Sequence, residues 1–305
     1  MAFGAFTTTA APAVDAGPRR RSRVAVLLLL PGLAYLALFF LVPLVSLVMT
    51  SLQSKVVGGD IGDYQFDLAF ANYATVVGLY GEHIARSFGF ALAATVLALL
   101  FSYPLAYFLG VTLRRYPLLQ ALGLTLVIAP FFISFLLRTL AWKQILSDEG
   151  MVLGTLKSLS VLPADAHVTG TAGAVIFGLA YNFIPFMTLP IYASLEKLDL
   201  RYVEAGGDLY ASPARTFFAV TLPLSAPGVI SGTLLTFIPA AGDYVNASNS
   251  FLGSPDVAMI GNAIESNFLT QQNYPVAASL SIILMAAILV LVAAYVRRSG
   301  TDDLI

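Results

Sequence analysis

The sequence contains no cysteine and only two histidines, His83 and His167. Without cysteine the chain has no disulfide, no thiolate metal ligand and no cysteine nucleophile. The histidines do not form a His-Glu-x-x-His pair, and no Gly-x-Ser-x-Gly elbow occurs. We therefore interpret both histidines as solvated loop residues and predict neither a metal site nor a catalytic residue.

Charge is scarce as well. Lys and Arg number 16 and Asp and Glu 17 among 305 residues, or 11% of the chain, about half the usual frequency. Apolar residues make up 58%, and the mean hydropathy is +0.83. This composition excludes an ordinary soluble domain and indicates that lipid surrounds most of the chain. The net charge of −1 argues against a nucleic-acid-binding protein.

A phosphate-binding P-loop is also missing. That motif requires a lysine preceded by glycine, whereas Ser, Trp, Leu and Glu precede the lysines Lys55, Lys143, Lys157 and Lys197. The chain is therefore expected to bind no nucleotide or other cofactor and not to be an enzyme. Any ATP hydrolysis must come from a partner.

Six charge-poor runs are long enough to cross about 30 Å of hydrocarbon as helices. The fold class is therefore an all-α integral membrane protein with a six-span domain over 24–298. The first run is too long for a cleaved signal peptide, and a disordered basic tail is expected over 1–23 and a second tail over 299–305. The expected spans are about 26–49, 88–109, 118–140, 172–193, 217–240 and 276–296.

The basic residues set the orientation, because Lys and Arg concentrate in cytosolic loops. An N-terminus in the cytosol places 11 of the 16 basic residues inside and five outside, so both termini are predicted to be cytosolic. The cytosolic side then carries a charge of +4 and the outer side −5. An acidic outer face is compatible with a cationic substrate, although topology alone gives the same asymmetry.

The inner loop 195–215 has an amphipathic pattern. Its apolar residues recur every three or four positions, which places them on one face of a predicted helix; they are Leu195, Leu198, Tyr202, Ala205 and Leu209. The opposite face carries Lys197, Arg201, Glu204 and Asp208. Such a helix lies at the lipid headgroups or inserts into the groove of a partner.

The residues that follow resemble a known signature. Glu204-Ala205-Gly206, three residues, Tyr210, nine residues, then Val220, Thr221 and Leu222-Pro223 is similar to the coupling motif of binding-protein-dependent ABC permeases. The family pattern is Glu-Ala-Ala, three residues, Gly, nine residues, Ile, any residue, Leu-Pro. The chain departs from it at Gly206 and Tyr210. Because Gly supplies a left-handed turn at low cost, we expect the loop to turn differently at Tyr210.

Further segments resemble the spermidine/putrescine permeases in particular, among them 134–142, 181–187, 196–199, 237–243 and 260–262. The resemblance implies a type I ABC importer permease fold in a bacterial cytoplasmic membrane. It also implies a second homologous permease, two cytosolic ATPases that bind ATP and Mg, and an extracytoplasmic polyamine-binding protein. The ATPase-coupling residues that it implies are Leu198, Arg201, Tyr202, Glu204, Ala205, Gly206, Asp208, Leu209, Tyr210, Leu222 and Pro223.

Polar and aromatic residues near the outer span ends are candidates for the substrate path. The Asp243 carboxylate is predicted to meet a substrate ammonium, with cation–π faces from Tyr244, Tyr181 or Phe186; alternatively Asp243 begins an interfacial loop. Arg138 either snorkels to the headgroups beside Trp142 or pairs with an acid, Asp148 or Glu149.

Two packing features complete the predictions. Gly228 and Gly232 give the fifth span a small face, which packs within the subunit or forms the seam with the second permease. In the loop 244–274, Ser254-Pro255-Asp256 predicts a helix start. Val257, Ile260, Ile264 and Phe268 then share a face, as a gate over the pore mouth or as a surface helix.

The sequence therefore predicts a permease subunit of an ATP-driven polyamine importer. The alternatives are an ABC permease for another small solute, an ion-coupled secondary transporter and a structural membrane protein. A secondary transporter requires coupling groups within its spans, and no predicted span has an acid near its centre.

Overall fold

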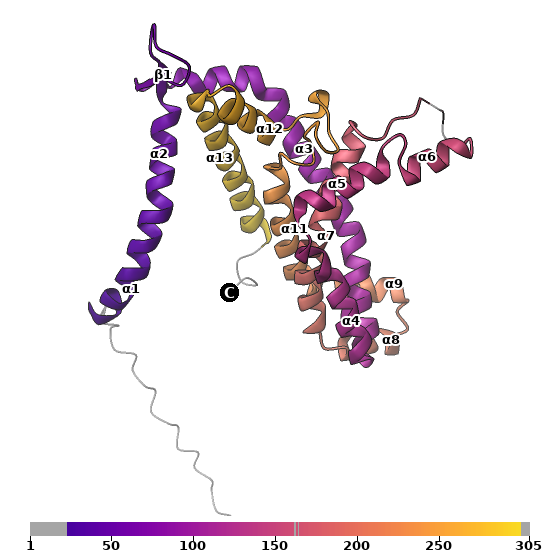
Figure 1. The fold of residues 1–305 in the computed structure, drawn as a ribbon. Helices are drawn as coiled ribbons and strands as arrows, with labels where there is room; N and C mark the ends of the chain where they lie inside the picture. The colour runs from indigo at the N-terminus through magenta and orange to yellow at the C-terminus, as the bar shows by residue number, and fades with distance from the viewer. Residues whose placement is uncertain (1–22, 162, 164, 300–305) are drawn as a thin grey trace, which may run out of the picture. The chain divides into compact units, whose positions relative to one another are not determined.

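The computed structural model describes residues 23–161, 163 and 165–299, and Figure 1 shows them mainly as helices. The expected tails, 1–23 and 299–305, fall outside these residues except for Arg23 and Ser299. The chain divides into two units, one ending at Leu47 and the other beginning at Val48. Each unit is described by itself.

The first unit is helical throughout its described part. It contains α1 (Arg23–Leu36), a π-helical turn (Ala37–Leu41) and most of α2 (Val42–Ser51). Leu27–Ser51 is long and apolar enough to cross a membrane. Residues 27–43 are all exposed, as expected of a helix whose apolar surface faces lipid or another membrane protein.

The second unit begins with a hairpin that hydropathy did not predict. Strands β1 (Gln53–Lys55) and β2 (Tyr64–Phe66) pair antiparallel. The helices that follow are α3 (Ala71–Tyr107), α4 (Pro117–Ile128), α5 (Phe135–Leu146), α6 (Met151–Ser158), α7 (Ala172–Glu196), α8 (Arg201–Asp208), α9 (Pro213–Thr216), α10 (Leu222–Leu224), α11 (Ala226–Ala241), α12 (Ile260–Glu265) and α13 (Tyr274–Ser299). Short 3₁₀ and π-helical turns join several of them, at 108–115, 129–132, 217–221, 255–257 and 266–270.

Helices α3, α7 and α11 pack against one another and form the centre of this unit. Small side chains allow the close approach: Ala91, Ala94 and Ala98 of α3 are fully buried. Figure 1 shows α8 and α9 at one end of the bundle and α12 at the opposite end. The bundle therefore carries two separate loop regions, one at each end.

Helix α3 begins at Ala71, well before the predicted span at 88. Glu82 and Arg86 interrupt the apolar run, but they form an i,i+4 ion pair on the helix surface. Hydropathy finds the part of a helix that crosses lipid and not the part that projects from it. The projecting part is anchored by Val76, which packs with Ile260 and Leu280.

The predicted span 118–140 is wrong as a single helix. Pro117–Phe132 and Phe135–Ser158 are bent by 95° at the break between them. Pro130 lacks the N–H that would continue the α-helical ladder, the chain tightens to a 3₁₀ turn there, and Ile133 is extended. A bend of 66° likewise separates Pro213–Leu224 from α11 within the predicted span 217–240. Four helices could cross a membrane alone, or up to six if each bent pair is one span.

Candidate functional site

The candidate site is the segment 197–225 between α7 and α11, here called the foot. The sequence predicted one helix over 195–215, and this is wrong: Leu195 still belongs to α7, and α8 covers only Arg201–Asp208. The chain turns because the Asp199 carboxylate accepts a hydrogen bond from the Arg201 N–H at 3.0 Å, which favours a new helix start.

The start of the foot is fixed to the bundle. Leu195 and Leu198 are buried, and the Leu198 carbonyl accepts a hydrogen bond of 2.8 Å from Arg114 Nη1. Close by, Gln120 Nε2 donates to the Tyr192 hydroxyl, which donates to Glu196 Oε1. These bonds join the turn after α3 to the start of the foot, and α4 to the end of α7.

Helix α8 ends in a Schellman motif with Tyr210 in the left-handed conformation, at φ +57°. The N–H of Ala211 donates to the Gly206 carbonyl, and the N–H of Tyr210 donates to the Gly207 carbonyl. The expectation that the loop turns differently here is wrong. The left-handed turn is present without glycine, at a steric cost of about 1–2 kcal/mol for a residue with a side chain.

The second departure from the family pattern, Gly206, has a packing reason. A Cβ atom at this position would lie 2.8 Å from both Cγ2 and Oγ1 of Thr216, closer than real Cβ contacts allow. Thr216 is buried and ends α9. The alanine that the family usually has would therefore push α8 away from α9 unless position 216 also changed.

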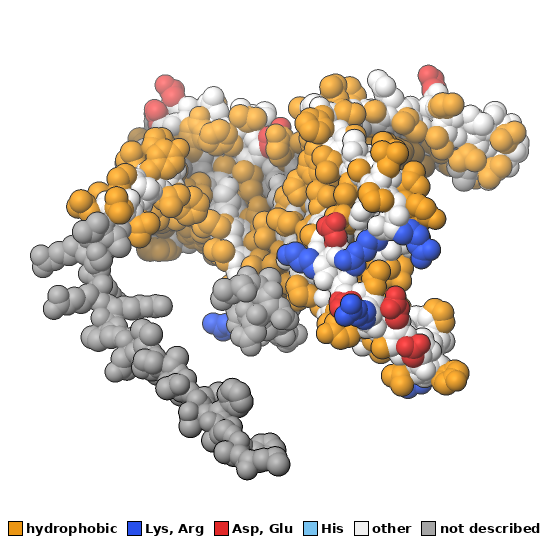
Figure 2. All heavy atoms as spheres, turned by 90° about the horizontal axis from the view of Figure 1, so that it is seen from below, with side chains coloured by type: hydrophobic (Ala, Val, Ile, Leu, Met, Phe, Trp, Pro, Cys, Tyr) orange, Lys and Arg blue, Asp and Glu red, His pale blue; other side chains and the backbone are white. Residues whose placement is uncertain are grey.

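The outer surface of α8 is largely bare. None of its eight residues, all of them described, is buried. Large side chains are exposed at Tyr202 (60%), Leu209 (81%) and Tyr210 (98%). Arg201, Glu204 and Asp208 are also exposed. Figure 2 looks onto this end of the bundle, where Lys, Arg, Asp and Glu side chains gather among hydrophobic ones.

The end of the foot is anchored to α3. Phe217 packs edge-on against Tyr103 and Tyr107, and the Tyr103 hydroxyl lies 2.7 Å from Ser225 Oγ. Ser225 stands at the 66° bend that follows Leu222-Pro223. These contacts connect the end of the foot to α3 at the point where α11 begins.

At the opposite end, Asp243 follows α11 and is buried. Its Oδ1 accepts a 2.7 Å bond from the Asn246 N–H, and its Oδ2 accepts one of 3.2 Å from Asn246 Nδ2. Burial raises the pKa of Asp243 to about 6, although bonds from Asn246, Ala247 and Val245 oppose that rise. In this structure the carboxylate holds its own loop, as the interfacial-loop alternative describes.

Sequence reasoning missed the polar residues next to Asp243. Asn182 Nδ2 lies 3.1 Å from Thr139 Oγ1 and 3.3 Å from Asn246 Oδ1, so α5, α7 and the loop after α11 share one buried polar chain. Asn182 was visible in the sequence as an amide inside an apolar run. Buried amides of this kind are costly unless they are hydrogen-bonded.

The other substrate-path candidates are dispersed. Tyr181 packs on Trp142 and lines an apolar cavity of ≈ 410 Å³ with Pro130 and Pro185. Phe186 packs on Phe131. Tyr244 is exposed, and its carbonyl accepts a bond from Asn262. Contact of these residues with a substrate stays a prediction.

Gly228 and Gly232 lie against α7 of the same chain. A Cβ at Gly228 would lie 2.6 Å from the Pro190 carbonyl oxygen, and one at Gly232 would lie 2.9 Å from Met187 Sδ. Packing against α7 within the subunit accounts for the absence of a side chain at both positions. A seam between this helix and a second permease stays a prediction.

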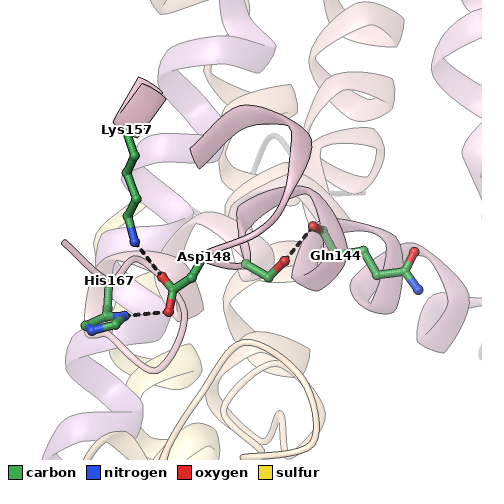
Figure 3. Close-up of polar contacts among 5 residues, drawn as sticks. Gln144, Asp148, Lys157 and His167 are labelled. Atoms are coloured by element: carbon green, nitrogen blue, oxygen red, sulfur yellow. Dashed lines mark hydrogen bonds and ion pairs between the residues drawn. The ribbon is translucent and has the colours of Figure 1, made fainter. Parts of the chain in front are cut away.

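The two readings of Arg138 are both corrected. Its side chain is buried, 5.7 Å from the Phe135 ring centre, so it does not snorkel, and it has no ion pair among the described residues. Asp148 instead pairs with Lys157 and His167 (Figure 3). Desolvation raises the pKa of Asp148, but the hydrogen bonds and charges of these two partners outweigh it and lower that pKa.

His167 is exposed, as expected of a solvated loop residue, whereas His83 lies within α3. No group of three or more His, Cys, Asp and Glu that could hold a metal occurs in the described part of the chain.

The helix predicted to start at Ser254 begins instead at Ile260, after a 3₁₀ turn. Ile260 is buried and Phe268 exposed, so the predicted common face is not formed.

Comparison with known proteins agrees with this arrangement. Residues 125–299 match the family described as binding-protein-dependent transport system inner membrane component. The chain is 34% identical to the spermidine/putrescine transport system permease protein PotB of Haemophilus influenzae, over 87% of this chain and 91% of that protein. PotB of Escherichia coli strain K12 is also 34% identical, over 87% and 94%.

The fold is similar to that of a solved bacterial ABC transporter involved in the import of the acidic polysaccharide alginate. The TM-score is 0.65 with 17% identity, over 90% of this chain and 94% of the other. That transporter has also been solved in complex with an alginate-pentasaccharide-bound periplasmic protein. With its apolar helices and its matching signature, the chain belongs to the family of binding-protein-dependent transport system inner membrane components.

Proposed function

We propose that this chain is a transmembrane subunit of an ATP-driven importer of polyamines and that the foot receives a cytosolic ATPase. The observation that supports the proposal is the exposed surface of α8, the helix that contains Glu204 and Ala205 of the coupling-motif resemblance. The polyamine substrate rests on the 34% identity with two PotB proteins along most of the chain.

The proposed topology has six spans with both termini in the cytosol and the permease domain over 24–298. The four long helices and the two bent pairs supply the six crossings. The excess of Lys and Arg on the side of the foot supports the orientation. ATP and Mg would bind the partner ATPases, since the lysines of this chain lack the P-loop context.

The proposed complex contains a second homologous permease, two ATPases and an extracytoplasmic binding protein. ATPase closure would move α8, and the close contact of Gly206 with Thr216 would pass the movement to α9. From there Phe217 and Ser225 connect to Tyr103 of α3 and to the bend before α11. The bundle around α11 would then reorient and open the path from the outer to the inner side.

Uptake of labelled spermidine or putrescine by proteoliposomes tests this function. The vesicles would contain the whole complex, with ATP inside and the loaded binding protein outside. Glu204→Ala should abolish most ATP-dependent uptake while leaving the thermal stability unchanged, because Glu204 is exposed. Glu149→Ala, which removes an exposed acid from the outer side, is the matched control and should transport normally. Uptake by the wild-type complex that does not depend on ATP would refute the proposal.

A further inference from the structure

Tyr210 combines two unfavourable features within the isolated chain. Its backbone is in the left-handed region at φ +57°, which favours glycine. Its side chain is 98% exposed, so the fold does not bury the ring. The Schellman bonds at this turn use only backbone groups of Tyr210 and Ala211, and a glycine at position 210 would form them with less strain. Among the described residues, the backbone conformation and the exposure of the ring therefore favour glycine over tyrosine at position 210.

The surroundings of Tyr210 have the composition of an interface centre. Leu209, at the C-terminal end of α8, and Tyr202, in its first turn, expose large side chains, and Arg201, Glu204 and Asp208 are exposed charges on the same helix. Protein interfaces typically have an apolar, aromatic-rich centre within a polar rim. Tyrosine is among the residues that most often supply the binding energy at such centres.

The charge of α8 argues against a membrane surface as the occupant. The helix carries one basic residue, Arg201, and two acidic ones, Glu204 and Asp208, which gives it a net charge of −1. Helices that lie on the cytoplasmic leaflet are usually basic, because that leaflet is anionic. A protein groove with an apolar pocket and a mixed polar rim matches this surface better.

We propose that Tyr210 is an anchor residue that inserts its ring into an apolar pocket of the ATPase subunit, with the exposed Leu209 side chain next to it in the sequence. The inference rests on the proposed function, since it names the contact through which the foot engages its ATPase. The family pattern has glycine at this position, and glycine has no side chain that could make such a contact. The strained turn presents the ring beyond the end of α8, where a partner can enclose it.

Three variants separate the ring from the turn. Tyr210→Phe keeps the ring, while Tyr210→Gly and Tyr210→Asn remove it and tolerate the left-handed backbone. The measurement is the affinity of the purified ATPase for the permease pair in nanodiscs, with thermal unfolding of the permease recorded in parallel. Tyr210→Phe should bind within about threefold of wild type, whereas the other two should bind at least tenfold more weakly. Tyr210→Gly should unfold at the same or a higher temperature.

Weaker binding of the ATPase to Tyr210→Gly, together with an unfolding temperature equal to or above that of the wild type, would support the proposed anchor role of Tyr210. Wild-type affinity for Tyr210→Gly would overturn it. Failure of the wild-type permease to bind the ATPase would instead refute the proposed function, so the two failures are distinguishable. Trp142 is the only tryptophan of the sequence, so a Tyr210→Trp substitution in a Trp142→Phe background gives the permease chain a single tryptophan at position 210. Quenching of its fluorescence by brominated lipids without the ATPase would also overturn the proposal, since the ring would then lie in the membrane.

Discussion

The two loop regions at the ends of α11 are built in opposite ways. The region 242–273, called the outer region after its position in the proposed topology, buries Asp243, Asn246, Met259 and Ile260. The foot, 197–225, contains a helix with no buried residue and exposes Leu209 (81%) and Tyr210 (98%). Several polar and apolar side chains of the outer region therefore pack within this chain, whereas the surface of α8 does not.

Glycines show the same difference. In the outer region a Cβ at Gly253 would lie 2.0 Å from the Ala247 carbonyl oxygen, and one at Gly261 would lie 2.6 Å from that of Asp243. In the foot, a Cβ at Gly207 would meet nothing within 4 Å. Backbone approaches backbone in the outer region, whereas in the foot Gly206 approaches only the Thr216 side chain and Gly207 approaches nothing within 4 Å. Substitution of single glycines by alanine tests this contrast, because each substitution adds one methyl group.

The largest effect is expected at Gly253. Gly253→Ala should lower the free energy of unfolding by about 3–4 kcal/mol, because backbone and not a flexible side chain must move to admit the methyl group. Thermal unfolding in detergent measures the change. Gly89→Ala is the control, since a Cβ at Gly89 on α3 meets nothing within 4 Å. Equal melting temperatures for the two variants would contradict the tight packing of the outer region.

The second prediction concerns pH. Burial raises the pKa of Asp243 to about 6 from an ordinary value of 3.8, so the folded chain binds this proton more tightly than the unfolded chain. The contribution of Asp243 to stability is therefore complete below about pH 4 and is lost as the pH rises to 6, by about 2–3 kcal/mol.

Asp243→Asn tests this dependence, because it cannot titrate. The slope of unfolding free energy against pH between 4 and 6 should be shallower in Asp243→Asn than in the wild type, measured by denaturation at fixed temperature. The foot provides the comparison: Gly207→Ala changes no titratable group, its added Cβ meets nothing within 4 Å, and it should keep the wild-type slope. Identical slopes in all three proteins would show that Asp243 is not a buried acid.

The sequence predicted the apolar segments well, because each one needs only its own composition to be recognised. The expected span 172–193 lies within α7, and 276–296 lies within α13. The sequence did not predict the bend at Ile133–Ser134, because hydropathy depends on the composition of an apolar run and not on whether its helix is straight. Nor could it predict the hairpin of Gln53–Lys55 with Tyr64–Phe66, which depends on pairing between two short polar segments.

The site shows the same limit. The signature residues Glu204 and Ala205 were found from spacing alone, but the reason for Gly206 is Thr216, ten residues away in a different helix. The break between α7 and α8 was missed because the apolar periodicity continues through it; α7 ends at Glu196, and α8 begins at Arg201 after the turn at Asp199. Contacts between elements, and not local preferences, decided these positions.

A third prediction addresses Gly206. Gly206→Ala restores the residue usual in the family but should lower stability by about 1–2 kcal/mol, because its methyl group meets Thr216. In the Thr216→Ala background, Gly206→Ala should lower the free energy of unfolding by much less. A double-mutant cycle on thermal unfolding measures the coupling. Additive effects of the two substitutions would show that α8 and α9 are not in close contact.

The smallest effect is expected at Gly207, which lies in α8 of the foot. Alanine favours a helix over glycine by about 1 kcal/mol, and the added methyl group has open space. Because α8 buries none of its residues, we expect it to open locally without global unfolding. Gly207→Ala should therefore slow amide hydrogen exchange in α8 by about fivefold and leave the exchange of α7 and α11 unchanged. If exchange slowed equally in all three helices, α8 would unfold together with the bundle, and the contrast between the two ends of α11 would not extend to their stability.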